Sequence, residues 1–283
     1  NGSHVDKSKQ TVSQFIDQWL VTYVTTNCTA RTSSGYEGNI KRYINPSIGS
    51  VAIQSLRPDH VQNIYSAMLE RGLSKTTVLH VHRILKEALG HAVKWGILTR
   101  NVADSVSPPR REEKEMEMWD IPTIHKFLEL SKGTRFGYLY KFALSTGMRR
   151  SEISGLKWES VEMPVGDDEK GSLGVVSALH RIEGHGLVEA EPKTKGSRRS
   201  ITLSPKTVDL LRAVRGTQEL RRIEFGSLWD NTGFVFTHPN GTPLIPDQIT
   251  QDFASISKRH SLPHLTFQGL RHAYATLALK KSI

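Results

Sequence analysis

A break in the sequence pattern between residues 105 and 118 limits what this chain can fold into. The stretch "SVSPPRREEKEMEM" has two adjacent prolines, a mixed run of charge and no apolar period. A helix or strand does not continue through such a stretch, because proline lacks an N–H donor and no apolar face is available for burial. We therefore expect a tag remnant and N-terminal tail at 1–10, a first domain at 11–104, a linker at 105–118 and a second domain at 119–283.

The first domain has apolar residues at helical spacing. In "KQTVSQFIDQWLVTYV", Phe15, Trp19 and Tyr23 recur every four residues, which is typical of an amphipathic helix. The same reasoning predicts helices at 34–44, ending at "NPSIG", at 57–72, and at 74–98. The first domain is thus predicted to be a four-helix unit.

The second domain mixes two periods. Helical patterns occupy 120–132, 135–145, 149–156, 205–222, 246–259 and 267–281. Between Trp158 and Leu203 the apolar period falls towards two, and glycines separate the short runs, as in antiparallel strands. The predicted fold class is mainly α with a small antiparallel β-sheet, or α+β.

The charge balance favours a partner rich in phosphate. The chain carries a net charge of +10, and residues 1–111 contribute 14 Lys and Arg against 7 Asp and Glu. Such an excess is typical of nucleic-acid binding, although a merely basic surface is the alternative. No apolar run reaches the roughly 18 residues that a membrane span needs. The single cysteine, Cys28, excludes an internal disulfide and suits a reducing cytoplasm.

Three stretches carry candidate chemistry. In "LSTGMRRSEISGL" (144–156), Arg149 precedes a predicted helix whose dipole favours an anion. An arginine there can bind phosphate oxygens bidentately, and Glu152 lies one turn on, where it can orient the arginine. A surface ion pair is the alternative.

The other two stretches lie later in the chain. "EAEPKTKGSRRSITLS" (189–204) is predicted to be a basic hairpin, whose cations could reach DNA, and the alternative is a solvated turn. In "LPHLTFQGLRHAYATLAL" (262–279), Thr266 is predicted to cap a helix that carries Gln268 and Arg271. A buried helix that carries an arginine needs an anionic partner for it.

Taken together, these stretches resemble the catalytic domain of the tyrosine recombinases, the phage integrase family. "TGMRRSE" resembles the family's first arginine box, T-G-x-R-x-x-E, and "PKTKGSRR" resembles its catalytic-lysine hairpin. "QGLRH" resembles its second box, H-x-L-R-H, with Gln268 in place of the usual histidine. The resemblance covers 120–283, and residues before it resemble the family's core-binding domain, which implies a two-domain clamp around DNA.

The resemblance also implies the roles of individual residues. Arg149 and Arg271 would hold the scissile phosphate, while Lys195, favoured over Lys193, would protonate the leaving oxygen. Gln268 would share in catalysis, and Glu152 and His272 would support it. Contacts to DNA are expected from Lys75, Arg83, Arg198 and Arg199. Neither a metal nor a cofactor is expected.

The resemblance implies partners and a missing residue. The partner would be double-stranded DNA at an attachment site, bound by a homo-tetramer on paired sites in the cytoplasm of a bacterial host, with a monomer in isolation. The nucleophilic tyrosine is expected beyond Ile283, so this chain by itself is expected to be inactive. The alternatives are a catalytically inactive DNA-binding protein of the same fold, which Gln268 favours, and a related resolvase or chromosome-dimer recombinase.

Overall fold

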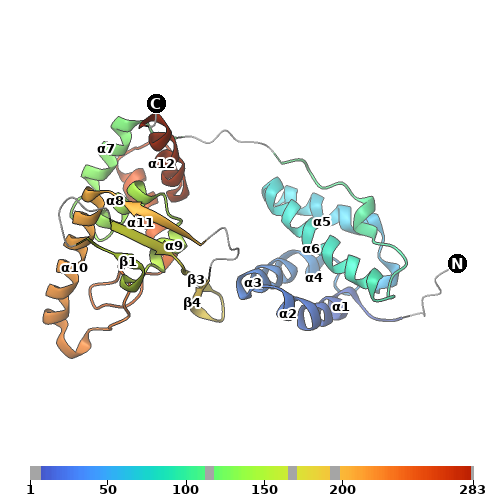
Figure 1. The fold of residues 1–283 in the computed structure, drawn as a ribbon. Coiled ribbons are helices and arrows are strands. Elements are labelled where there is room, and N and C mark those ends of the chain that lie inside the picture. The colour runs from blue at the N-terminus through green and yellow to red at the C-terminus, as the bar shows by residue number, and fades with distance from the viewer. Residues whose placement is uncertain (1–7, 112–117, 165–170, 192–197, 282–283) are drawn as a thin grey trace. The chain divides into compact units, whose positions relative to one another are not determined.

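The computed structural model describes residues 8–111, 118–164, 171–191 and 198–281, with side chains described up to residue 274. The chain divides into two compact units, Asn1–Lys114 and Glu115–Ile283 (Figure 1). The boundary falls within the stretch 105–118. Val106, at the start of that stretch, is buried in the core of the first unit.

Over its described residues, 8–111, the first unit contains four helical runs. The first joins α1 (Val12–Trp19), a π-helical turn (Leu20–Val24) and α2 (Thr25–Asn27), and the second joins α3 (Ala30–Asn39), a π-helical turn (Ile40–Ile44) and α4 (Asn45–Ile48). A 3₁₀ turn (Ile53–Ser55) leads to α5 (Pro58–Glu70), which is followed by α6 (Lys75–Lys94) and a 3₁₀ turn (Val102–Ser105). The side chain of Thr11 caps α1 by accepting a hydrogen bond from the Gln14 N–H.

The second run extends further than the sequence pattern indicates. It continues through Pro46 to Ile48 instead of ending at "NPSIG". The π-helical turn explains this difference, because the Asn45 N–H donates to the Ile40 carbonyl, five residues back. That wider turn accommodates the proline, which has no N–H to donate.

Aromatic and aliphatic side chains fill the core of the first unit. Trp19 is fully buried and stacks on Tyr36, with ring centroids 5.7 Å apart. Tyr65 and His82 share a buried hydrogen bond of 2.7 Å, so His82 has a structural partner. Over the residues that the structure describes, no group of three or more His, Cys, Asp and Glu side chains could hold a metal ion.

The second unit contains six α-helices in its described ranges, and these confirm the sequence prediction with bounds shifted by three residues at most. They are α7 (Ile121–Leu130), α8 (Gly137–Thr146), α9 (Arg150–Ser154), α10 (Pro205–Phe225), α11 (Pro246–Arg259) and α12 (Phe267–Lys281). The Asp120 side chain caps α7 by accepting from the Thr123 N–H at 2.9 Å. Phe127, Tyr140 and Phe253 pack together at the centre of this unit.

In the part of the second unit that the structure describes, the strands form two small antiparallel sheets. One has the order β1 (Val161–Glu162), β2 (Gly171–Val175), β5 (Arg199–Leu203), and the other pairs β3 (Ala178–Ile182) with β4 (Gly186–Ala190). The α+β class is thus confirmed, with its sheet divided into two. Within the described residues no helix is long and apolar enough to cross a membrane.

The predicted basic hairpin at 189–204 is wrong as a strand pairing. β4 pairs with β3 and β5 pairs with β2, so this segment connects two sheets. The apolar side chains of Leu173, Val175 and Leu203 explain the pairing, since together they cover the core from β2 and β5. Lys193 and Lys195 lie outside the described residues.

The hairpin β3–β4 packs directly on the end of α9. A Cβ atom at Gly155, which follows α9, would lie 2.8 Å from the backbone nitrogen of Leu179 in β3. The Lys157 ammonium also pairs with Glu189 of β4 at 2.9 Å. These contacts fix α9, and thus the residues at its start, against the strands.

Candidate active site

A tight turn places Arg149 at the start of α9. Helix α8 ends at Gly147, whose φ of 60° is left-handed and whose N–H donates to the Ala143 carbonyl. Met148 is buried, and Arg149 follows in an extended conformation at the N-cap of α9. Glycine is suited to this position because other residues are strained at such a φ. The turn leaves the Arg149 side chain half-exposed.

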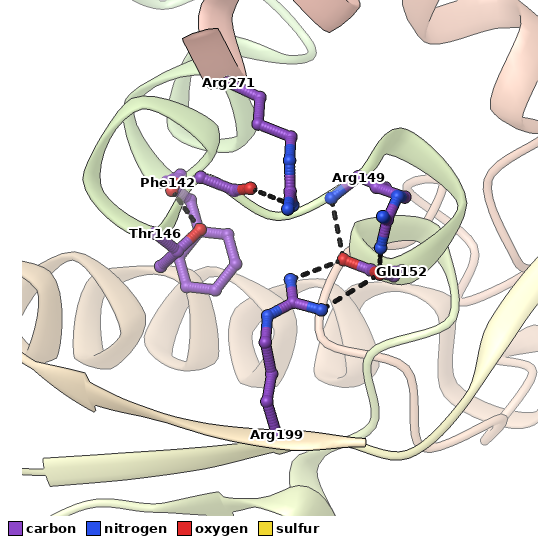
Figure 2. A network of polar contacts seen from close by, with 7 residues as sticks. Phe142, Thr146, Arg149, Glu152, Arg199 and Arg271 are labelled. Carbon is purple, nitrogen blue, oxygen red and sulfur yellow. Dashed lines mark hydrogen bonds and ion pairs between the residues drawn. The ribbon is translucent and has the colours of Figure 1, made fainter. Parts of the chain in front are cut away.

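Glu152 is the centre of a hydrogen-bond network, which Figure 2 shows from close by. Its side chain is only 5% exposed. One carboxylate oxygen accepts from Arg149 Nη1 at 2.8 Å and from Arg199 Nη1 at 3.1 Å. The other accepts from the Arg149 backbone N–H at 2.8 Å and from Arg199 Nη2 at 2.7 Å. Each oxygen therefore accepts two hydrogen bonds, which satisfies a buried carboxylate.

This network keeps Glu152 ionised. Burial by itself would raise the pKa of Glu152, but hydrogen bonds from Arg199 and Arg149 and the Arg199 charge outweigh it and lower the pKa to about 2. A charged carboxylate thus lies beneath two guanidinium groups at any physiological pH.

Arg271 approaches the same turn from α12. Its Nη1 donates to the Gly147 carbonyl at 2.5 Å, although the two residues lie 124 positions apart in sequence. Burial lowers the pKa of Arg271, and the charges of Arg149 and Arg199 lower it further. Three arginines therefore share one electrostatic environment with one carboxylate, and we call Arg149, Glu152, Arg199 and Arg271 the arginine cluster (Figure 2).

An open cleft of about 490 Å³ adjoins the arginine cluster. Arg199, Arg271 and His272 line it, together with Gly147 and Tyr274. The Tyr274 ring lies so close to Gly147 that a Cβ atom there would be 2.4 Å from a ring carbon. A cleft with two guanidinium groups on its wall is suited to a phosphate or another oxyanion.

Arg150, which follows Arg149 in the sequence, has different neighbours. Arg150 Nη1 donates to Thr250 Oγ1 at 2.6 Å and lies 3.1 Å from Asp247 Oδ1. Both partners belong to the first turns of α11, so Arg150 attaches α9 to α11. The partners of Arg150 lie about a hundred positions away, so its role could not be predicted from its local sequence.

The remaining predicted site residues that the structure describes lie on the surface of both units. Gln268 is exposed on the first turn of α12, and Gly269 N–H donates to Thr266 Oγ1 at 3.3 Å, as the predicted cap requires. Arg198 is exposed and pairs with Glu191. Lys75 and Arg83 are exposed on α6 of the first unit. Sequence reasoning missed the contact of Arg199 with Glu152, and the basic run around it gave no signal that separates it from Arg198.

Two family models match the chain. Residues 11–69 match the N-terminal SAM-like domain of phage integrases, and residues 114–283 match the phage integrase family itself.

Curated relatives match nearly the whole chain. A tyrosine recombinase XerC-like protein of Caldanaerobacter subterraneus is 27% identical over 100% of this chain and 76% of its own length. An integrase of Saccharopolyspora erythraea is 25% identical over 95% of this chain and 72% of its own length.

Solved structures share the fold. The Tn1549 transposon integrase in complex with transposon right end DNA gives a TM-score of 0.78 at 22% identity, over 96% of this chain and 88% of that one. A lambda integrase tetramer bound to a Holliday junction gives 0.71 at 14% identity, over 98% and 72%. At this level of identity the likeness concerns the fold.

Proposed function

The chain belongs to the phage integrase family of tyrosine recombinases, enzymes that cut and rejoin DNA in site-specific recombination, and we propose that its arginine cluster binds the scissile phosphate. One observation carries this assignment. Arg149 and Arg271 come from distant parts of the sequence and meet at the backbone of one turn, and Gly147 of that turn and Arg271 line an open cleft. Like charges repel, so a structure that gathers them is suited to an anionic ligand.

The proposed reaction conserves the phosphodiester energy. A tyrosine hydroxyl gives up its proton to a base and attacks the phosphorus, the bond to the 5′-oxygen breaks, and a 3′-phosphotyrosyl link forms. The phosphate gains negative charge in the pentacoordinate transition state, and guanidinium groups held in advance stabilise that charge. The leaving 5′-oxygen takes a proton, for which we propose Lys195, or else Lys193. Attack by the 5′-hydroxyl of another strand reverses the step and completes the exchange.

Gln268 and His272 take secondary roles in this proposal. Gln268 is exposed near the start of α12, from which its amide can donate a hydrogen bond to a phosphate oxygen. An amide does not transfer protons at neutral pH, so proton transfer must fall to another group. His272 directly follows Arg271 in the sequence and lines the same cleft.

DNA is the partner that we propose for this chain. The Tn1549 integrase is bound to transposon DNA and the lambda integrase to core-site DNA, and we carry this partner class over to the present chain. Lys75 and Arg83 would contact phosphates from the first unit, and Arg198 from the second. The two units would form a clamp on the DNA. Like the lambda tetramer on a Holliday junction, four protomers would assemble on paired attachment sites, from monomers in isolation.

Covalent trapping tests the proposal directly. The full gene product is incubated with nicked duplexes tiled from the DNA that flanks its gene, in the presence of EDTA. We expect a protein–DNA adduct that survives SDS, and peptide mapping then identifies the attacking tyrosine. Arg149→Ala serves as the matched variant, which should bind the same duplex without forming the adduct.

Absence of an adduct on a duplex that the protein binds tightly would contradict the proposal. That outcome would favour the second candidate, a DNA-binding protein of the same fold that does not cut. Gln268→His would then be the first variant to examine, since it restores the residue type that the family usually has there.

A further inference from the structure

Arg199 occupies an unusual place for a residue of a basic segment that is predicted from sequence to contact DNA. It is the first residue of β5, and both of its terminal nitrogens donate to Glu152, at 3.1 and 2.7 Å. Its side chain is 27% exposed, against 56% for its neighbour Arg198. A bidentate pair with a buried carboxylate engages the edge of this guanidinium that carries both terminal nitrogens.

Arg149 makes a looser contact with the same carboxylate. One terminal nitrogen of its side chain reaches Glu152, at 2.8 Å, and the side chain is 49% exposed. The two arginines thus differ in how much of each is available. Arg199 is held by Glu152 through both terminal nitrogens, and the Arg149 side chain is more exposed to solvent.

This geometry determines the net charge of the arginine cluster. With Arg149 as its only partner, Glu152 would neutralise the charge that a phosphate is meant to meet. Because Arg199 adds a second positive charge to the same carboxylate, the three groups together keep a net charge of +1, and Arg271 brings the arginine cluster to +2. A phosphoryl group that becomes dianionic in its transition state matches that charge.

We propose that Arg199 is a positioning residue, which holds Glu152 beneath Arg149 and so leaves Arg149 oriented and charged for the phosphate. This inference rests on the proposed function, since it deepens the account of the same site. Arg199 also joins the strand β5 to the start of α9, two elements that are 47 positions apart at this contact. Arg199 lines the cleft, but both of its terminal nitrogens already donate to Glu152, so in this proposal it acts through that carboxylate.

A double-mutant cycle tests this role. The variants are Arg199→Met, which keeps the length without the charge, Arg199→Lys, Glu152→Gln, and the double variant of Met and Gln. Arg222→Met is the matched control, because Arg222 forms an exposed pair with Glu219 in the same unit. The measurements are the single-turnover rate of adduct formation, the Kd for the duplex and the salt dependence of that Kd.

We expect Arg199→Met to slow adduct formation about 10²-fold, since small misplacement of a binding group has effects of that order. The Kd and its salt slope should stay close to the parent values. Arg199→Lys should recover part of the rate, because it restores the charge without the fork. When Glu152→Gln is already present, adding Arg199→Met should slow adduct formation little further, as expected for residues that act as one unit.

Two outcomes would overturn the proposal. Rate losses that add in full across the cycle would mean that Arg199 acts independently of Glu152. A weaker Kd together with a salt slope reduced by about 0.9 would mean that Arg199 neutralises a DNA phosphate directly.

Unfolding as a function of pH separates this inference from the proposed function. Without Arg199, the pKa of Glu152 should rise, so Arg199→Met should be less stable than the parent near neutral pH and should lose less stability than the parent as acid is added. An unchanged acid profile would overturn the positioning role, whether or not the parent forms an adduct. A shifted profile in a protein that forms no adduct would place the failure in the proposed function.

Discussion

The arginine cluster and the exposed face of α6 use positive charge in opposite ways. In the cluster, three arginines converge on one turn and one buried carboxylate. On α6, Lys75, Arg83, Lys86 and Lys94 are exposed one after another along a helix. Lys86 pairs with Asp104 at 2.9 Å, with both side chains about half-exposed.

The difference lies in how far each charge depends on its neighbours. Hydrogen bonds through Glu152 couple Arg149 to Arg199 in a partly desolvated site, where charges interact strongly. Exposed pairs on a helix are screened by water and salt and contribute about 0–1 kcal/mol each. Substitutions in the arginine cluster should therefore have large, non-additive effects on the reaction rate, whereas those on α6 should have small, additive effects on affinity.

The largest expected effect separates two adjacent arginines. Arg149→Ala should reduce adduct formation by about 10³-fold or more, since it removes a donor to the transition-state charge. Arg150→Ala is the matched control, because Arg150 bonds to Thr250 and Asp247 of α11. It should lower the thermal unfolding temperature by a few degrees and change the rate far less. Similar rate losses for both variants would contradict the assignment of the phosphate to Arg149.

The second prediction concerns acid. The folded-state pKa of Glu152 is about 2, below its ordinary value of 4.5, so this group stabilises the fold above about pH 4.5 and that stability is lost as the pH falls towards 2. With about 1.4 kcal/mol for each unit of pKa, the loss is on the order of 3 kcal/mol. Chemical unfolding of Glu152→Gln and the parent between pH 2 and 7 measures it. The difference between the two proteins should shrink at low pH, and a constant difference would contradict the pairing.

The same contrast explains what the sequence could predict. Helix bounds follow from local periodicity and caps, and Asp120 and Thr266 cap their helices as predicted. Arg149 and Arg271 stand in recognisable local patterns, so they could be chosen in advance. The partner of Arg199 could not, because it depends on which strands pair, and β5 pairs with β2 rather than with β4.

Long-range pairing also explains why no role could be predicted for Arg150. The T-G-x-R-x-x-E pattern singles out Arg149 and leaves the next arginine without an assigned role. That role depends on α11, which brings Thr250 and Asp247 to Arg150 from about a hundred positions away. The π-helical turn before Pro46 is a similar case, because its hydrogen-bond shift leaves no mark in the apolar pattern.

The third prediction tests the turn that joins the arginines. Gly147→Ala should destabilise the second unit by about 2 kcal/mol, since φ is 60° and the new Cβ would overlap the Tyr274 ring. Gly133→Ala is the matched control, because Gly133 has φ 74° with no atom within 4 Å of an added Cβ. Chemical unfolding of both variants isolates the ring contact. Equal losses would mean that φ strain accounts for the whole effect.

The smallest expected effect belongs to the face of α6. Arg83→Ala should weaken binding to the duplex by about 1 kcal/mol or less and reduce the slope of log K against log salt by about 0.9, as for one phosphate contact. Titrations at several salt concentrations measure both quantities. The adduct rate at saturating DNA should stay unchanged, because Arg83 lies in the first unit, outside the arginine cluster.

Arg83→Ala and Arg199→Met form the sharpest pair of variants for this comparison, since each removes one positive charge. Arg83→Ala should change the salt slope of DNA binding and leave the rate of adduct formation unchanged. Arg199→Met should change the rate of adduct formation and leave the salt slope unchanged. If both changed the slope alike, Arg199 would be one more phosphate contact, and the distinction between a coupled cluster and a dispersed face would fail. If Arg83→Ala left the slope unchanged, α6 would not lie on the DNA, and the positive charge of the first unit would need another explanation.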